Sequence, residues 1–408
     1  MTSAGRGDCL DAFVVALNQA CWNGQEKRWY ASTLELQLAS LEFCGACRRV
    51  PTLKVFVEPE TPRSLWSPRD STSNREVCIS SRVPVVQASG LIWKLNTEDV
   101  AERIGSMSWL RRVEAMVFVS DMPIVGVAWP ASLRRLSFGY RFNQPIVGVE
   151  WPASLLKLSF EYYFNQPIVG VAWPASLQLL SFGQCFNQPI ADVVWPDSLQ
   201  RLSFARNFHQ PIAAVRWPAS LQQLSLGEGF NHPIAGVEWP ASLRQLAFGC
   251  AFSRRIAGVA WPTSLRKLTF GQFFNRRLDG VAWPASLQLL SFGQCFNKPV
   301  VGVTWPTSLR QLSFGDLFDQ PIVGVEWPTS LLELSFGDRF NQPVADVVWP
   351  ASLWRLSFGE EFNQPIVGIE WPASLRRLSF GRDLEQSLSG VAWPASLSVV
   401  TRDGVRQL

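Results

Sequence analysis

From residue 129 onward, large apolar side chains recur along the chain with a period of 22 residues, and a tryptophan marks each period. One unit, residues 129–150, contains seven large apolar positions in those 22 residues. A single unit of this length cannot enclose them, whereas stacked units shield them jointly, at roughly 1.5–3 kcal/mol per buried side chain. The pattern therefore predicts a solenoid of about thirteen repeats. The marking tryptophans are Trp129, Trp151, Trp173, Trp195, Trp217, Trp239, Trp261, Trp283, Trp305, Trp327, Trp349, Trp371 and Trp393.

Within each unit, the local pattern predicts a strand and excludes a helix. In residues 136–138, two apolar residues flank one small polar residue, which is the alternation of a strand. Pro130 and Pro145 recur in most units and cannot lie inside a regular helix, and two glycines per unit mark turns. We expect a mainly β, leucine-rich-repeat-like solenoid with one short parallel strand per repeat. The opposite side is expected to be extended or 3₁₀-like, or to form a second short strand from Ile146 to Val149.

An asparagine follows the second phenylalanine of most units. Its side chain offers both a donor and an acceptor, so a stack of such amides can satisfy the backbone of successive turns. We interpret this column as a structural asparagine ladder, with direct contact to a ligand as the alternative. Its members are Asn143, Asn165, Asn187, Asn231, Asn275, Asn297, Asn341 and Asn363.

The motif F-N-Q-P-I, joined to P-x-S-L-x-x-L-x-F-G, resembles the FNIP repeat, a 22-residue relative of the leucine-rich repeats, from about residue 121 to 397. The resemblance implies a leucine-rich-repeat-like solenoid that serves protein–protein interaction. Two departures leave the curvature open. A tryptophan precedes the proline where many FNIP units carry an aliphatic residue, and the asparagine comes two places later than in the usual leucine-rich pattern.

The sequence predicts three segments. Residues 1–107 are an N-terminal region or cap of unassigned fold with small mixed α/β content, residues 108–400 are the solenoid, and residues 401–408 are a C-terminal tail. The solenoid opens with a degenerate unit at 108–124. In the N-terminal region, the patterns indicate a helix at 10–22, strands at 52–57 and 83–86, and a linker at 59–75.

Composition narrows the class of protein. The 408 residues are 47% hydrophobic and 17% charged, and a net charge of +4 is too small to indicate nucleic acid by itself. No segment has the 18 or so apolar residues that cross a bilayer, and Asp8 and Asp11 interrupt any signal peptide. The eight cysteines do not form a disulfide framework. We therefore expect a cytoplasmic protein that does not associate with a membrane.

Catalytic chemistry is not indicated. The two histidines, His209 and His232, are variants of repeat positions, and no nucleophile–base arrangement or phosphate-binding loop can be identified. Cys44 and Cys47 form half of a zinc site at most, and ordinary thiols are the alternative. The prediction is a non-enzymatic protein without a cofactor or metal.

A variable position precedes the second leucine of each unit and, by alternation, points away from the core. A constant core with variable outward residues is what a recognition surface needs, although an unconstrained solvated face gives the same pattern. The small residues at Ser137 and its counterparts would form a shallow groove beside this row, roughly 60 Å long. The partner-binding residues predicted here are Arg135, Lys157, Arg201, Gln223, Gln245, Lys267, Gln311, Glu333, Arg355 and Arg377.

Consecutive units also replace Gln-Pro by basic residues. Stacking would align these cations along one edge, where they could bind an acidic partner. Neutral drift is the alternative. The residues are Arg254, Arg255, Arg276, Arg277 and Lys298.

Taken together, these patterns favour a monomeric interaction scaffold that binds an extended protein partner on the face of its parallel sheet. Two alternatives stay open: a basic stripe that binds a polyanion or nucleic acid, although a nucleic-acid partner is not expected, and a structural array without a specific ligand. The residues name neither the ligand nor the pathway.

Overall fold

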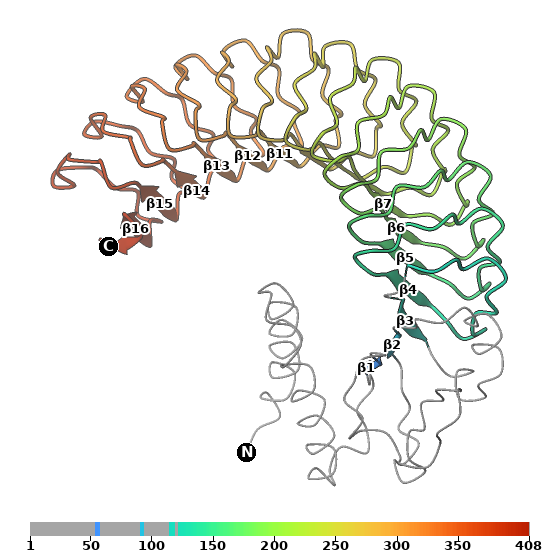
Figure 1. Ribbon diagram of the computed structural model, residues 1–408. Helices are drawn as coiled ribbons and strands as arrows, with labels where there is room; N and C mark the ends of the chain where they lie inside the picture. Colours follow the sequence, from blue (N-terminus) through green and yellow to red (C-terminus); the bar gives the residue numbers. More distant parts are fainter. Residues whose placement is uncertain (1–53, 58–89, 94–113, 119–120, 408) are drawn as a thin grey trace, which may run out of the picture. The chain divides into compact units, whose positions relative to one another are not determined.

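The computed structural model describes residues 54–57, 90–93, 114–118 and 121–407 (Figure 1). The chain divides into two compact units, Met1–Leu95 and Asn96–Leu408. In the first unit, β1 (Lys54–Val57) and β2 (Gly90–Trp93) form a parallel pair. β1 lies within the range 52–57 that the sequence predicts as a strand, whereas β2 is not predicted. The strand expected at 83–86, the helix at 10–22, the linker at 59–75, and Cys44 and Cys47 lie outside the described residues.

The second unit is a solenoid to which each repeat contributes one short strand. The strands are β3 (Ala115–Phe118), β4 (Arg135–Phe138), β5 (Lys157–Phe160), β6 (Leu179–Ser181), β7 (Arg201–Ser203), β8 (Gln223–Ser225), β9 (Gln245–Ala247), β10 (Lys267–Thr269), β11 (Leu289–Ser291), β12 (Gln311–Ser313), β13 (Glu333–Ser335), β14 (Arg355–Ser357), β15 (Arg377–Phe380), β16 (Val399–Arg402) and β17 (Val405–Arg406).

Neighbouring strands from β3 to β16 pair in parallel with a constant register. Leu136 of β4 lies beside Leu158 of β5, for example. Equal repeat positions therefore form straight columns across the sheet. The strands line the concave side of this unit, and the connections between them form its convex side (Figure 1). The leucine-rich-repeat-like solenoid with one parallel strand per repeat is confirmed, and the described residues contain no helix.

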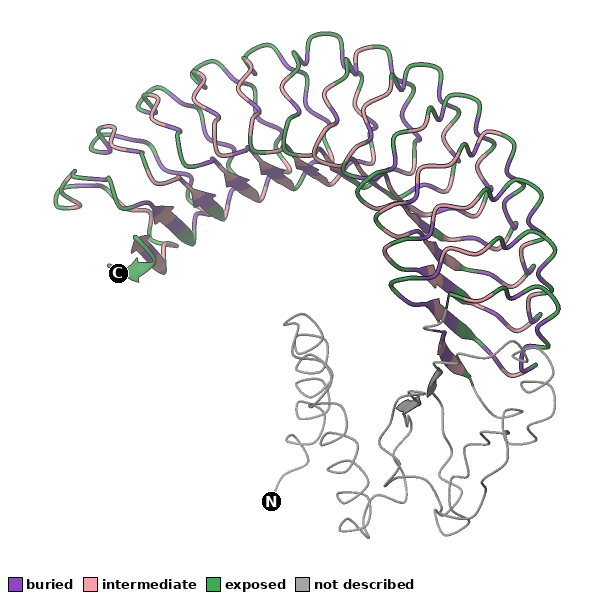
Figure 2. Cartoon of the chain, in the orientation of Figure 1, coloured by how far each residue is buried: buried purple, intermediate pink, exposed green. Residues whose placement is uncertain are grey.

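Buried residues recur in every repeat, both on the strands and in the connections (Figure 2), and they form columns of like apolar side chains. Leu133, Leu136, Phe138 and Phe142 are at most 1% exposed, and the same places are buried along the array. The ring of Phe142 stacks on that of Phe164, with centroids 6.0 Å apart. Each repeat thus covers the apolar groups of the next one, which is the joint shielding that the sequence pattern requires.

The side opposite the sheet is built from turns. Val149 donates its backbone N–H to the carbonyl of Ile146 at 3.3 Å, which closes a tight turn. Gly148 lies inside it with φ of 82°, a conformation that glycine adopts without strain. The second short strand considered for 146–149 is therefore wrong: a left-handed residue ends the extended backbone that a strand would need.

The asparagine ladder is present as predicted. Asn165 donates its backbone N–H to Oδ1 of Asn143 at 2.9 Å, and Gln166 donates Nε2 to the backbone carbonyl of Asn143, also at 2.9 Å. The same bonds recur along much of the array, and aspartate replaces asparagine at Asp319, whose Oδ1 accepts the N–H of Asn341 at 3.0 Å. The ladder supplies partners for backbone groups that the stacked turns would otherwise leave without any.

The C-terminal edge of the sheet is covered by a hairpin. β17 pairs antiparallel with β16, and Asp403 and Gly404 adopt positive φ in the turn between them. The hairpin runs from Val399 to Arg406, so it begins in the last residues of the predicted solenoid and continues into the predicted tail, 401–408. A covered edge no longer offers a row of free backbone groups to another chain. The described residues include no helix that could span a membrane.

Candidate binding surface on the concave sheet

The strands present one row of variable side chains on the concave face. In β4 the first residue, Arg135, is exposed, Leu136 is buried and Ser137 is half-buried; in the strands that follow, up to β15, the first residue is exposed or half-buried and the leucine after it is buried. The core column therefore stays leucine while its neighbours vary. The ten residues that the sequence places in this row all lie on the concave strands; Gln223, Gln311 and Glu333 among them are half-buried and the rest are exposed.

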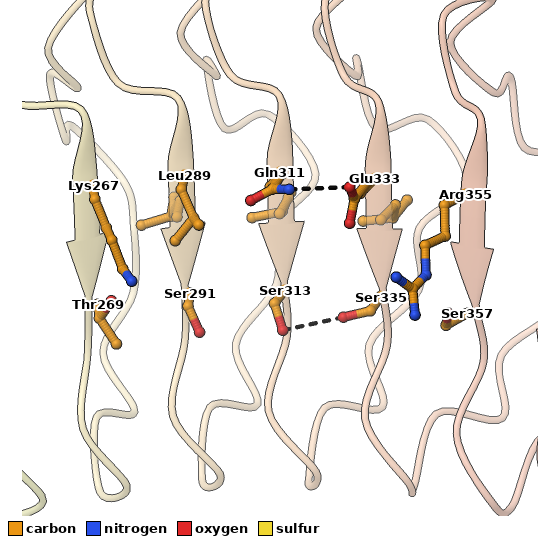
Figure 3. A pocket seen from close by; sticks show the side chains of 13 residues that line it. Lys267, Thr269, Leu289, Ser291, Gln311, Ser313, Glu333, Ser335, Arg355 and Ser357 are labelled. Atoms are coloured by element: carbon orange, nitrogen blue, oxygen red, sulfur yellow. Dashed lines mark hydrogen bonds between the residues drawn. The ribbon is translucent and has the colours of Figure 1, made fainter. Parts of the chain in front are cut away.

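A shallow hollow of about 460 Å³ extends across β10 to β14 of this face (Figure 3). Its floor consists of hydroxyl side chains from the third strand position, and its upper rim consists of the variable row. The residues labelled there are Lys267, Thr269, Leu289, Ser291, Gln311, Ser313, Glu333, Ser335, Arg355 and Ser357.

Side-chain hydrogen bonds tie the middle of the hollow together. Gln311 donates Nε2 to a carboxylate oxygen of Glu333 at 3.0 Å, and the hydroxyl of Ser335 donates to that of Ser313 at 3.1 Å. Both bonds join neighbouring strands (Figure 3). They hold the amide, the carboxylate and the hydroxyls in fixed places, so the floor presents ordered donors and acceptors.

Charge is distributed along the hollow. Lys267 stands at one end and Arg355 at the other, and in Figure 3 both side chains bend toward the hydroxyl floor. Glu333 lies between them and Leu289 adds an apolar contact. Next to Arg355, on β15, the guanidinium of Arg377 lies over the ring of Trp354 at 5.7 Å from its centroid, a favourable cation–π geometry. Trp354 was missed in the sequence reading; the signal was an aromatic residue in a column otherwise occupied by arginine, glutamine, leucine and serine.

Three tyrosines cluster where β4 and β5 end. Tyr140 and Tyr163 are 51% and 45% exposed, and the Tyr140 ring stacks on that of Tyr162 at 4.7 Å. Desolvation among the rings, followed by the hydrogen bond to Tyr163, raises the pKa of Tyr140 above its ordinary value. Beside them, burial raises the pKa of Glu161, which stands where most repeats have glycine. These positions vary in sequence, and the structure gathers them at one rim.

The predicted basic residues lie elsewhere. They stand in the connections after the strands, so they do not join the concave row. Arg254 and Arg276 donate Nε to backbone carbonyls, and Arg277 pairs with Asp279 at 2.9 Å, with both side chains exposed. The structure thus divides the predicted site residues between two surfaces.

We next consider the metal-ligating groups and the histidines in the described part of the chain. It contains no group of three or more histidine, cysteine or acidic residues placed to hold a metal ion. The rings of His209 and His232 lie 4.4 Å apart, and each has a ring nitrogen within hydrogen-bonding distance of a backbone carbonyl. The two rings thus support neighbouring turns.

Comparisons with known proteins agree with this architecture. The sequence profile of the FNIP Repeat family matches residues 142–185, 186–229, 318–361 and 340–383. Among solved structures, the chain is similar to CroV588, described as a novel circular LRR protein, at 35% identity and a TM-score of 0.63. That match covers 77% of this chain and 48% of CroV588, so the chain spans about half the length of that protein.

Two further solved structures are more distant. The Toll–Spatzle complex of Drosophila matches at 12% identity with a TM-score of 0.45, over 77% of this chain and 46% of that chain. YopM from Yersinia enterocolitica matches at 18% identity with a TM-score of 0.35, over 71% and 72% of the two chains. No curated protein matches the chain.

Proposed function

The chain belongs to the FNIP-repeat proteins, and from that premise we propose that it is a non-enzymatic scaffold whose concave sheet binds an extended segment of a partner protein. One observation carries the proposal. From β4 to β15 the buried middle residue of every strand is leucine, whereas the residue before it is arginine, lysine, leucine, glutamine or glutamate. Within these strands, the buried leucine is constant and the outward-facing residue before it changes in size and charge.

The hollow across β10 to β14 suits an extended polypeptide. Its length follows the strand-to-strand direction, and its floor of serine and threonine hydroxyls can both donate to and accept from a peptide backbone. Lys267 and Arg355 can hold acidic groups near the two ends, and Leu289 can contact an apolar side chain. A shallow open hollow of this kind buries too little of a small metabolite to bind it tightly.

The scaffold is proposed to act as a monomer. The hairpin of β16 and β17 covers the C-terminal edge of the sheet, which supports a single copy in solution. We place it in the cytoplasm, because the free thiols of Cys185, Cys250 and Cys295 persist most readily in a reducing compartment.

The experiment fills the hollow. Peptides of random sequence are selected on the full chain, and their dissociation constants are measured by fluorescence anisotropy. The test variant carries Ser313→Tyr and Ser335→Tyr, which place two rings on the floor. We expect the dissociation constants to rise at least tenfold, because the backbone of the peptide can no longer reach the hydroxyl row.

The matched control adds two rings in the connections instead. Thr304→Tyr and Val348→Tyr alter exposed positions that precede the stacked tryptophans. We expect less than a twofold change for this variant. Equal affinity of wild type and hollow-filled variant, with both variants unfolding at the same urea concentration as wild type, contradicts the proposal.

A further inference from the structure

One column of the array changes character over four consecutive repeats. In the repeats before and after them this place is glutamine, and Gln210, for example, donates Nε2 to the carbonyl of Asn187 at 3.0 Å. The four exceptions are His232, Arg254, Arg276 and Lys298. The column returns to glutamine at Gln320. We call these four residues the basic column.

The arginines of the basic column are anchored by the backbone. Arg254 donates Nε to the carbonyl of Asn231, and Arg276 donates Nε to the carbonyl of Ser253, each at 2.7 Å. Each arginine thereby takes over the bond that glutamine makes elsewhere. Both side chains remain exposed, so the Nη groups are available while the Nε bond restricts the side chain. A cation held in place loses less conformational freedom when it binds an anion.

Two ladder bonds are missing in these repeats, whereas the bond from the backbone N–H of Ser253 to Oδ1 of Asn231 is intact at 3.0 Å. His209 and Ser253 occupy ladder positions without the amide oxygen of asparagine. Among the described residues, no side-chain oxygen accepts the backbone N–H of Asn231 or Asn275, the next members of the ladder. The neighbouring ladder bond from Asn297 to Asn275 is intact at 3.0 Å. Departures from a structural rule gather at functional places in natural proteins, and here they coincide with the basic column.

The spacing of the column suits an extended peptide. The buried phenylalanines two places before its members stack with centroids 6.0, 6.1 and 6.1 Å apart over these repeats. Three such steps separate His232 from Lys298, which is about 18 Å at the position of the phenylalanines. In a strand, side chains on one face recur about every 6.6 Å, twice the rise of about 3.3 Å per residue. The spacing of alternate residues in an extended peptide is thus close to the spacing of successive repeats.

We infer that the basic column binds an extended acidic peptide, about seven residues long, with carboxylates at alternate positions. Guanidinium groups form short, charge-assisted hydrogen bonds with carboxylates, and those of Arg254 and Arg276 supply the central contacts. Arg255 is exposed beside them and adds positive charge. Beyond Lys298, Asp319 in the ladder introduces a negative charge, which limits the site to these repeats. The phosphates of a duplex nucleic acid follow a helical path, so they match the straight basic column less well than the carboxylates of an extended peptide do.

This site is separate from the concave hollow, because its residues stand in the connections between strands. The binding experiment uses the full chain and a labelled peptide in which glutamate alternates with serine, at about 50 mM salt, where exposed charges are weakly screened. The variant changes Arg254, Arg276 and Lys298 to glutamine, the residue that the repeats carry elsewhere. Glutamine preserves the anchoring bond, so the fold is retained. We expect at least tenfold weaker binding.

Two controls separate this site from general charge attraction. The variant with Arg141, Arg206 and Arg216 changed to glutamine loses the same charge from other exposed places and should change affinity less than twofold. A peptide of the same composition with its glutamates in one block should bind wild type several-fold more weakly than the alternating peptide. Equal losses in the two variants overturn the inference, as does tighter binding of a single-stranded RNA of equal charge. Neither result touches the concave proposal, whose test alters other residues.

Discussion

Removing one ladder side chain should open the array locally. Oδ1 of Asn165 accepts the backbone N–H of Asn187 at 2.9 Å and Nε2 of Gln188 at 3.0 Å. Asn165→Ala deletes the oxygen that accepts both bonds. Gln188 keeps its bond to the carbonyl of residue 165, so the main loss is at the N–H of Asn187. A partly buried group left without a partner costs about 1–3 kcal/mol, and we expect about 2 kcal/mol here.

Aspartate provides the matched control. Oδ1 of Asp319 accepts the N–H of Asn341 at 3.0 Å and Nε2 of Gln342 at 2.7 Å, so a carboxylate performs both tasks within this chain. Asn165→Asp lies between two neutral ladder members, Asn143 and Asn187, and meets no adjacent carboxylate in the ladder. We therefore expect it to cost less than about 0.5 kcal/mol, within the range of ordinary surface substitutions.

Hydrogen exchange is the assay, because the repeats of a solenoid need not unfold together. A loss of about 2 kcal/mol corresponds to about thirtyfold faster exchange at the amide of Asn187, since 1.4 kcal/mol is a factor of ten. Repeats more than two units away should exchange as in wild type. The ladder reasoning fails if Asn165→Ala leaves the Asn187 amide as protected as before, or if the alanine and aspartate variants exchange equally.

Two further predictions concern the core and one carboxyl. Trp305 is 6% exposed, and its indole N–H has no hydrogen-bond acceptor in the described structure, so Trp305→Phe loses packing alone. It should cost about 1 kcal/mol, against about 3–5 kcal/mol for Phe318→Ala at a fully buried site, as urea unfolding will show. Because burial raises the pKa of Glu161, its charged form disfavours the fold. That penalty disappears as pH falls below the pKa of the unfolded chain, so Glu161→Gln should stabilise at pH 7 and have no effect near pH 3. A stabilisation that is independent of pH would exclude this cause.

The repeat made the fold of the second unit predictable, whereas individual contacts were not. Alternation at residues 136–138 and the period of 22 define the strand and its register, because a one-residue slip would expose every leucine. The turn at 146–149 was ambiguous, since Ile146 and Val149 look like strand residues and only the left-handed Gly148 decides against it. The link between Gln311 and Glu333 depends on rotamers, which a sequence pattern does not specify.

The basic residues show the same limit more sharply. The repeat alone predicts that these residues align with one another. Whether they lie on the concave face or in the connections depends on the path of each connection, which the repeat does not specify. That Arg254 and Arg276 take over the glutamine bond could not be read from charge. His232 belongs to the same column, and its place in the 22-residue period is the signal that assigns it there.

The curvature of the solenoid follows from the spacing between equivalent residues of neighbouring repeats, which differs from one column to another. Strands of a sheet lie about 4.7–4.9 Å apart. The phenylalanines that end or follow the strands stack at larger distances, as with Phe270 and Phe292 at 5.7 Å, and the tryptophans farther along stack at 6.4 Å, as with Trp305 and Trp327. Each repeat is therefore wider away from the sheet, which places the strands on the concave side. The tryptophan that departs from the aliphatic residue of many FNIP units contributes this width. The variable side chains stand on the strands, which are closely spaced, so a partner on that face meets a dense row of variable groups.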